Sequence, residues 1–95
     1  MAAYLIAELD VQDAAQFEEY RKLVPATIAK YGGRYVVRGG ATETLEGGWT
    51  PKRIVVLEFP TMEQARRWYH SSDYAPALAL RLKAAKTKAI LVEGA

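Results

Sequence analysis

Residues that could do chemistry gather in a glycine-rich segment between residues 32 and 53. Six of the seven glycines lie there as three adjacent pairs, at positions 32–33, 39–40 and 47–48. Because glycine tolerates positive φ and close backbone approach, such pairs indicate turns or bends. The same segment brings Arg38, Glu46, Trp49 and Arg53 together within a short stretch of chain, and it also contains Tyr35. We therefore expect a binding site near these turns.

Arg38 and Glu46 have two possible roles. The forked donors of Arg38 could anchor a carboxylate or an enolate, with Glu46 lining the same cavity. Alternatively, the two side chains could form a salt bridge that holds a hairpin or a dimer interface. The sequence leaves both roles open.

His70 is the only histidine, so it is the only side chain whose ordinary pKa lies near neutrality. An imidazole facing a pocket could move a proton. The alternative is a surface histidine near a helix C-terminus, where the helix dipole favours its cation. Both interpretations remain open.

Aromatic residues are numerous for a chain of this size. Five of them could together build a pocket for a flat or acyl ligand: Tyr20, Tyr35, Trp49, Tyr69 and Tyr74. Aromatic residues at helical spacing more often belong to a core, which is what we expect of Trp68. Trp49 follows a glycine pair and is the better candidate for contact with a ligand or a partner.

Several kinds of site have no signal in the sequence. Cysteine is absent, histidine occurs once and the carboxylates are scattered, so we expect no metal site. No phosphate-binding loop or nucleophilic serine motif occurs, and we expect no cofactor. The net charge is only +2, and we interpret the basic residues between positions 81 and 88 as the solvated end of a helix. No nucleic-acid partner is expected.

Composition is typical of one globular domain spanning residues 1–95. Hydrophobic residues make up 51% and charged residues 25% of the chain. The N-terminus has no basic region of the kind that begins a signal peptide, and no apolar run approaches the ~20 residues of a membrane span. We therefore expect a cytoplasmic protein without a membrane partner.

The hydrophobic pattern predicts alternating strands and helices. Strands are expected at residues 4–10, 34–38, 52–59 and 87–93, with residues 42–46 continuing or re-pairing the second strand after a bend at Gly39-Gly40. Asp13 and Thr61 each precede a glutamine by three positions, which is typical of a helix start. The first helix should end at Gly32 and contain Pro25. A third helix should begin at Ser72 or Asp73.

This order places the helices on one face of the sheet, because right-handed crossovers lead to the same side. The first, third and last strands are apolar on both alternations, so the other face also needs cover. A second copy of the chain would supply it. We therefore predict a homodimer that forms through the open sheet face.

Several short motifs resemble one known family. They are Tyr31-Gly-Gly-Arg-Tyr35, Arg38-Gly-Gly40, Leu45-Glu-Gly47, Phe59-Pro60 and Trp68-Tyr69. They resemble the bacterial domain-of-unknown-function family numbered 1330, over residues 3–94. The resemblance implies an α+β, ferredoxin-like βαββαβ fold with an antiparallel four-stranded sheet, helices on one face, and assembly as a dimeric α/β barrel. The resemblance also implies membership of the dimeric α/β-barrel superfamily, which includes cofactor-free monooxygenases, lactone isomerases and haem-handling enzymes.

The hypothesis from these residues is a homodimer that binds an unknown small molecule. It would be a cofactor-free enzyme acting on a carbonyl or enolisable substrate if His70 moves a proton and Arg38 stabilises the anion that develops. Under this hypothesis, the apolar part of the ligand is held by Tyr35, Trp49 and Tyr74. The alternatives are a non-catalytic metabolite-binding or stress-associated dimer, and a haem-handling protein with His70 as axial ligand.

Overall fold

A computed structural model describes all residues from 1 to 95. The chain folds as one four-stranded sheet with three helices. The elements follow in the order β1 (Ala3–Val11), α1 (Ala14–Lys30), β2 (Arg34–Arg38), β3 (Ile54–Phe59), α2 (Met62–Tyr69), α3 (Ala75–Ala84) and β4 (Ala85–Glu93). The sheet order is β2-β3-β1-β4, and every neighbouring pair is antiparallel.

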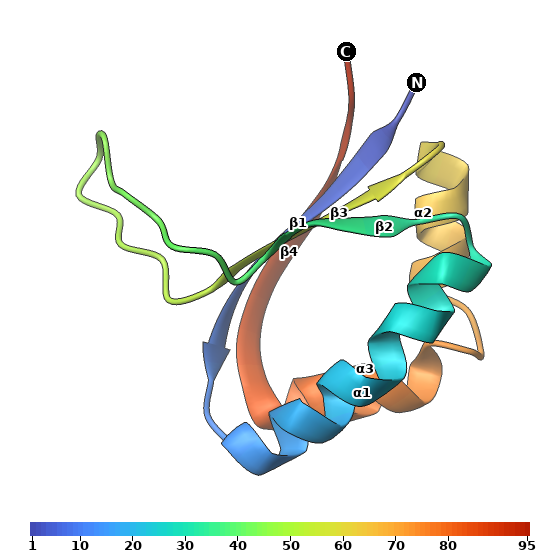
Figure 1. The fold of residues 1–95 in the computed structure, drawn as a ribbon, viewed down its shortest axis with the longest axis horizontal. Helices are drawn as coiled ribbons and strands as arrows, with labels where there is room; N and C mark the ends of the chain where they lie inside the picture. The colour runs from blue at the N-terminus through green and yellow to red at the C-terminus, as the bar shows by residue number, and fades with distance from the viewer.

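The helices lie together on one side of the sheet, as expected (Figure 1). Strands β2 and β4 are free edges, so the sheet of one chain is open and not a closed barrel. None of the three helices has the length and hydrophobicity needed to cross a lipid bilayer.

Both predicted helix starts are capped by side chains. Asp13 Oδ1 accepts a hydrogen bond from the Gln16 backbone N–H at 3.1 Å, and Thr61 Oγ1 accepts one from Gln64 at 3.1 Å. Helix α1 continues through Pro25, and Gly32 follows its end with a φ of 79°. These local signals were therefore sufficient to locate the first two helices.

The prediction of a strand at residues 42–46 is wrong. Residues 39–53 form a loop that extends away from the helices (Figure 1). All of residues 41–50 are exposed, so no apolar face exists to hold them in the sheet. The bend at Gly39 is confirmed by its φ of 72°. Strand β3 consequently begins at Ile54, and not at Lys52.

The interpretation of the basic residues near the C-terminus is also wrong. Helix α3 ends at Ala84, and Lys86 and Lys88 lie on β4 opposite Asp10 and Glu8 of β1. Arg81 belongs to α3 but is buried, with 4% of its surface exposed. The helical spacing of these bases was thus coincidental, because the chain passes directly from α3 into β4.

The core lies between the helices and the facing side of the sheet. Trp68 is 1% exposed, as expected of a core residue, and donates through Nε1 to Thr27 Oγ1 at 3.0 Å. The opposite side of the sheet carries apolar residues without cover. Their exposed fractions are 36% for Ile6, 61% for Ile90 and 41% for Val92.

Candidate functional site

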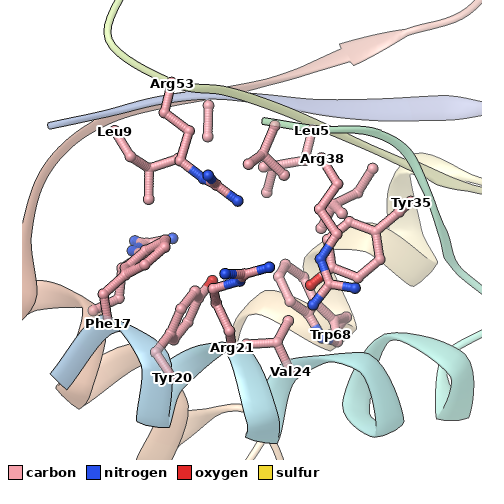
Figure 2. Close-up of a pocket in the computed structure, with 14 residues that line it drawn as sticks. Leu5, Leu9, Phe17, Tyr20, Arg21, Val24, Tyr35, Arg38, Arg53 and Trp68 are labelled. Atoms are coloured by element: carbon pink, nitrogen blue, oxygen red, sulfur yellow. The ribbon is translucent and has the colours of Figure 1, made fainter. Parts of the chain in front are cut away.

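A pocket opens between α1 and the helix-facing side of the sheet (Figure 2). It is a narrow hollow, and ten of its 14 lining residues are hydrophobic. The apolar wall comes from β1, β3 and the first helix, and includes Leu5, Ala7, Leu9, Phe17, Val24, Val55 and Leu57. Such a surface suits the apolar body of a small molecule.

All four charged residues that line this pocket are arginines. They come from different elements: Arg21 from α1, Arg38 from the end of β2, Arg53 from just before β3, and Arg81 from α3. No aspartate or glutamate lines the pocket. Figure 2 shows the guanidinium groups of Arg21, Arg38 and Arg53 directed into the same space from opposite walls. The pocket therefore combines a group of positive charges with an apolar wall.

These arginines are poorly compensated by the protein. Arg21 pairs with Glu18 at 3.3 Å on the surface, whereas Arg53 and Arg81 form no ion pair. The Nε atoms of Arg21, Arg53 and Arg81 are buried and have no hydrogen-bond partner. Burial lowers the pKa of Arg53, and the neighbouring charges of Arg21 and Arg38 lower it further. An anion in the pocket would supply hydrogen-bond acceptors for these arginines and would offset the repulsion between their charges.

A β-bulge brings Tyr35 and Arg38 to the same wall of this pocket. Tyr35 pairs with Leu57, and Arg38 pairs with Val55, with a register shift between Tyr35 and Val37. Residues three apart in a regular strand point to opposite faces, but the extra residue of a bulge restores a common side. The Arg38 Cζ atom lies 4.4 Å from the centre of the Tyr35 ring. This contact orients the guanidinium toward the pocket.

Arg81 is held by tyrosine hydroxyl groups and not by a carboxylate. Its Nη1 donates to the Tyr74 hydroxyl at 3.1 Å, and its Nη2 donates to the Tyr69 hydroxyl at 3.4 Å. The Tyr74 and Tyr20 hydroxyl oxygens are 3.0 Å apart. Burial raises the pKa of Tyr74 well above its ordinary value, so this phenol stays neutral. Arg81 thus keeps an unneutralised charge beside the pocket.

The residues proposed from the sequence do not meet at one place. Tyr35 and Arg38 line the pocket, and Tyr74 is wholly buried behind Tyr20. Glu46 and Trp49 lie on the loop, beside a separate hollow over the open side of the sheet. No ion pair joins Arg38 to Glu46. Only part of the predicted set therefore shares a cavity.

Trp49 and His70 lie outside the arginine-lined pocket. The Trp49 Nε1 donates to Glu8 Oε2 of β1 at 3.2 Å, while 58% of its surface is exposed. His70 is the exposed C-cap residue of α2, and it lies in a third hollow with Tyr69 and Ile90. Its ring packs edge-on against Tyr69, with the ring centres 5.2 Å apart. The structure does not place His70 in the pocket that Arg38 lines.

Of the residues that line this pocket, Tyr20 and Arg53 were noted as candidates from the sequence, whereas Arg21 and Arg81 were not proposed as site residues. A signal existed for Arg21, because it follows Phe17 by four positions and precedes Val24 by three, on the buried stripe of α1. Arg81 gave no such signal, since its burial depends on how α3 packs against α1 and α2. No cluster of three or more potential metal-binding side chains occurs in the structure.

Comparison with solved structures defines the class of fold. A protein of unknown function from Rhodopseudomonas palustris has a TM-score of 0.79 at 15% identity, over 99% of this chain and 82% of its own. A dimeric ferredoxin-like protein of unknown function from Jannaschia sp. CCS1 has a TM-score of 0.72 at 9% identity, over 99% and 100%. SnoaB, a cofactor-independent oxygenase from Streptomyces nogalater, has a TM-score of 0.68 at 16% identity, over 99% and 93%. The chain therefore has a ferredoxin-like fold.

The family itself follows from the sequence. The model of the family described as "Domain of unknown function (DUF1330)" matches residues 2–95. The chain belongs to this family, as its glycine-rich motifs suggested. No curated protein matches the chain.

Proposed function

We propose that the chain binds an anionic small molecule with an apolar body in the pocket between α1 and the sheet. The observation that carries this proposal is the set of four arginines without a single lining carboxylate. Buried guanidinium groups without partners are unfavourable, and a bound carboxylate or enolate would supply the missing acceptors. The hydrophobic wall would contact the rest of the ligand.

The same arrangement supports a cofactor-free enzyme acting on a carbonyl or enolisable substrate. Fixed positive groups stabilise an enolate more than its neutral parent, which lowers the barrier to its formation. Because no general base lines the pocket, the carbon-bound proton would pass to solvent. The similarity of fold to a cofactor-independent oxygenase is compatible with this chemistry. Neither an imidazole nor a carboxylate lines the pocket, so the geometry favours stabilisation of an anion over proton transfer by His70.

The second part of the proposal is a homodimer. Ile6, Ile90 and Val92 leave an apolar strip on the side of the sheet opposite the helices. A second copy of the chain would cover this strip and remove it from water. The description of a structural neighbour as dimeric supports the same assembly.

The binding proposal is tested by calorimetric titration with benzoate and with benzyl alcohol, its neutral counterpart. We expect benzoate to bind and benzyl alcohol not to bind. Arg53→Gln should weaken benzoate binding about tenfold, which corresponds to ~1.4 kcal/mol. Arg66→Gln is the matched control, because Arg66 lies on α2 in the hollow that contains His70. A loss of affinity in Arg66→Gln but not in Arg53→Gln would move the site to that hollow and contradict the proposal.

Catalysis is separated from binding by deuterium exchange. Phenylpyruvate would be incubated with the protein in deuterated water, and its carbon-bound protons followed by NMR. Faster exchange than in buffer, lost in Arg53→Gln, is the expected result for an enzyme that stabilises an enolate. Saturable binding with no gain in exchange would support the non-catalytic alternative.

A further inference from the structure

A chain of hydrogen bonds connects the buried Arg81 with the wall of the pocket. Arg81 Nη1 lies 3.1 Å from the Tyr74 hydroxyl, which lies 3.0 Å from the hydroxyl of Tyr20. Tyr20 lines the pocket, whereas Tyr74 does not line it and has no exposed surface. Arg81 and Tyr20 thus both line the pocket, and the buried Tyr74 connects them.

The direction of these hydrogen bonds follows from the donors available. A guanidinium only donates, so the Tyr74 oxygen must be the acceptor from Arg81. Tyr74 has one hydroxyl proton, and no acceptor other than the Tyr20 oxygen lies within hydrogen-bond distance of it. A buried hydroxyl without an acceptor is unfavourable. Tyr74 therefore donates to Tyr20.

This direction leaves the proton of Tyr20 free. The Tyr20 oxygen accepts from Tyr74, and its hydroxyl has no other partner in the protein. Because this side chain lines the pocket, its proton is available to an acceptor that enters there. Hydrogen bonds in series polarise one another, and the charge of Arg81 stands at the far end of this series. Tyr20 should therefore be a stronger donor than an isolated phenol.

We infer that Tyr20 donates a hydrogen bond to a carbonyl or enolate oxygen of the ligand, and that Tyr74 and Arg81 are positioning residues for it. This inference rests on the proposed function. Arg21, Arg38 and Arg53 would take the carboxylate of the same ligand, since their guanidinium groups face the same space (Figure 2). The ligand class is then a carboxylate with a second oxygen acceptor close by, such as a 2-oxo acid with an apolar substituent.

The binding test uses phenylpyruvate and 3-phenylpropanoate, which differ only in the 2-oxo group. The wild-type protein should bind phenylpyruvate about tenfold more tightly. Tyr20→Phe should abolish this preference, and Tyr74→Phe should reduce it while leaving the affinity for 3-phenylpropanoate unchanged. Tyr4→Phe is the control, because the Tyr4 hydroxyl donates to Glu58 Oε2 outside the pocket. A preference that survives in Tyr20→Phe would overturn the inference.

A second measurement decides the hydrogen-bond direction without any ligand. In a neutron structure of the deuterated wild-type protein, the hydroxyl deuterium of Tyr74 should point to the Tyr20 oxygen. The deuterium of Tyr20 should point into the pocket. A deuterium on Tyr20 directed at Tyr74 would overturn the inference. If neither probe bound to the wild-type protein, the proposed function would fail, and the neutron result would still decide whether Tyr20 is the free donor.

Discussion

The guanidinium of Arg38 lies over the ring of Tyr35, with Cζ 4.4 Å from the ring centre, although the two residues are three positions apart on one strand. The bulge between Tyr35 and Val37 makes this contact possible. It gives an edge strand two pocket-lining side chains on one face, whereas a regular strand would place them on opposite faces. The bulge is thus a structural requirement of the proposed site.

Deletion of Val36 should separate this pair. The deletion restores the regular alternation and turns either Tyr35 or Arg38 to the open side of the sheet. We expect benzoate affinity to fall about tenfold and the free energy of unfolding to fall by roughly 1–3 kcal/mol. Val36→Ala keeps the bulge, and the Val36 side chain is 46% exposed, so this control should bind normally. Unchanged affinity in the deletion variant would show that the bulge has no role in binding.

Gly39 makes room for Arg53, and this relationship can be tested separately. Gly39 has a φ of 72°, and a Cβ atom built on it would lie 2.6 Å from the Arg53 Cζ. Gly39→Ala should therefore displace the guanidinium and weaken benzoate binding, in addition to backbone strain of about 1–2 kcal/mol. Gly47→Ala carries comparable strain at a φ of 84° but meets nothing within 4 Å. Equal affinities in the two variants would contradict the role given to Gly39.

Local sequence signals predicted the fold well because they act over a few residues. The capping side chains of Asp13 and Thr61 and the positive φ of Gly32 each depend on neighbouring positions alone. The register of β2 could not be predicted in this way. The expected bend at Gly39 is present, but the bulge between Tyr35 and Val37 was not expected, because pairing with β3 sets its position.

The candidate site was only partly predictable for the same reason. Tyr35 and Arg38 line the pocket, but their sequence neighbourhood also suggested Glu46 and Trp49, which the loop carries to another hollow. The buried position of Arg81 depends on packing between helices. The spacing of basic residues along the sequence does not indicate such packing. Charged residues are seldom fully buried, so the sequence favoured the opposite interpretation.

Replacement of Arg81 by methionine should separate binding from stability. Arg81 is 4% exposed without a carboxylate partner, and an apolar residue of similar length removes the desolvation of this charge. We expect the free energy of unfolding to change by no more than about 1 kcal/mol. Binding of benzoate should weaken, because a positive group is lost from the pocket. Thermal melting and titration test both parts, with Arg66→Met as the surface control. A large loss of stability would indicate a structural role for the charge.

Asp73 should make the stability of the fold depend on pH. Its carboxylate accepts hydrogen bonds from Lys30 Nζ at 2.9 Å and from the Tyr31 hydroxyl at 2.9 Å. The Lys30 bond, followed by the Tyr31 bond, holds the pKa of Asp73 below its ordinary value of 3.8. A lowered carboxylate pKa stabilises the folded state above pH 3.8, and this contribution is lost as pH falls below it.

The corresponding variant is Asp73→Asn. At neutral pH it should melt at a lower temperature than the wild type, and the difference should be smaller at about pH 3, below the ordinary pKa of the carboxyl. Glu43→Gln is the control, because Glu43 is an exposed loop residue without an ion pair. A melting difference that is the same at both pH values would mean that ionisation of Asp73 is not its source.

The homodimer is tested by placing a charge on the apolar strip. Ile90 of β4 lies opposite Ile6 of β1 and is 61% exposed in the single chain. If a second copy covers this strip, Ile90→Asp buries an unpaired carboxylate in the interface, which is strongly unfavourable. We expect sedimentation to show a dimer for the wild type and a monomer for Ile90→Asp. Leu82→Asp changes an equally apolar residue of α3 that is 67% exposed, and it should remain dimeric. Dissociation by Leu82→Asp alone would place the interface on the helical side.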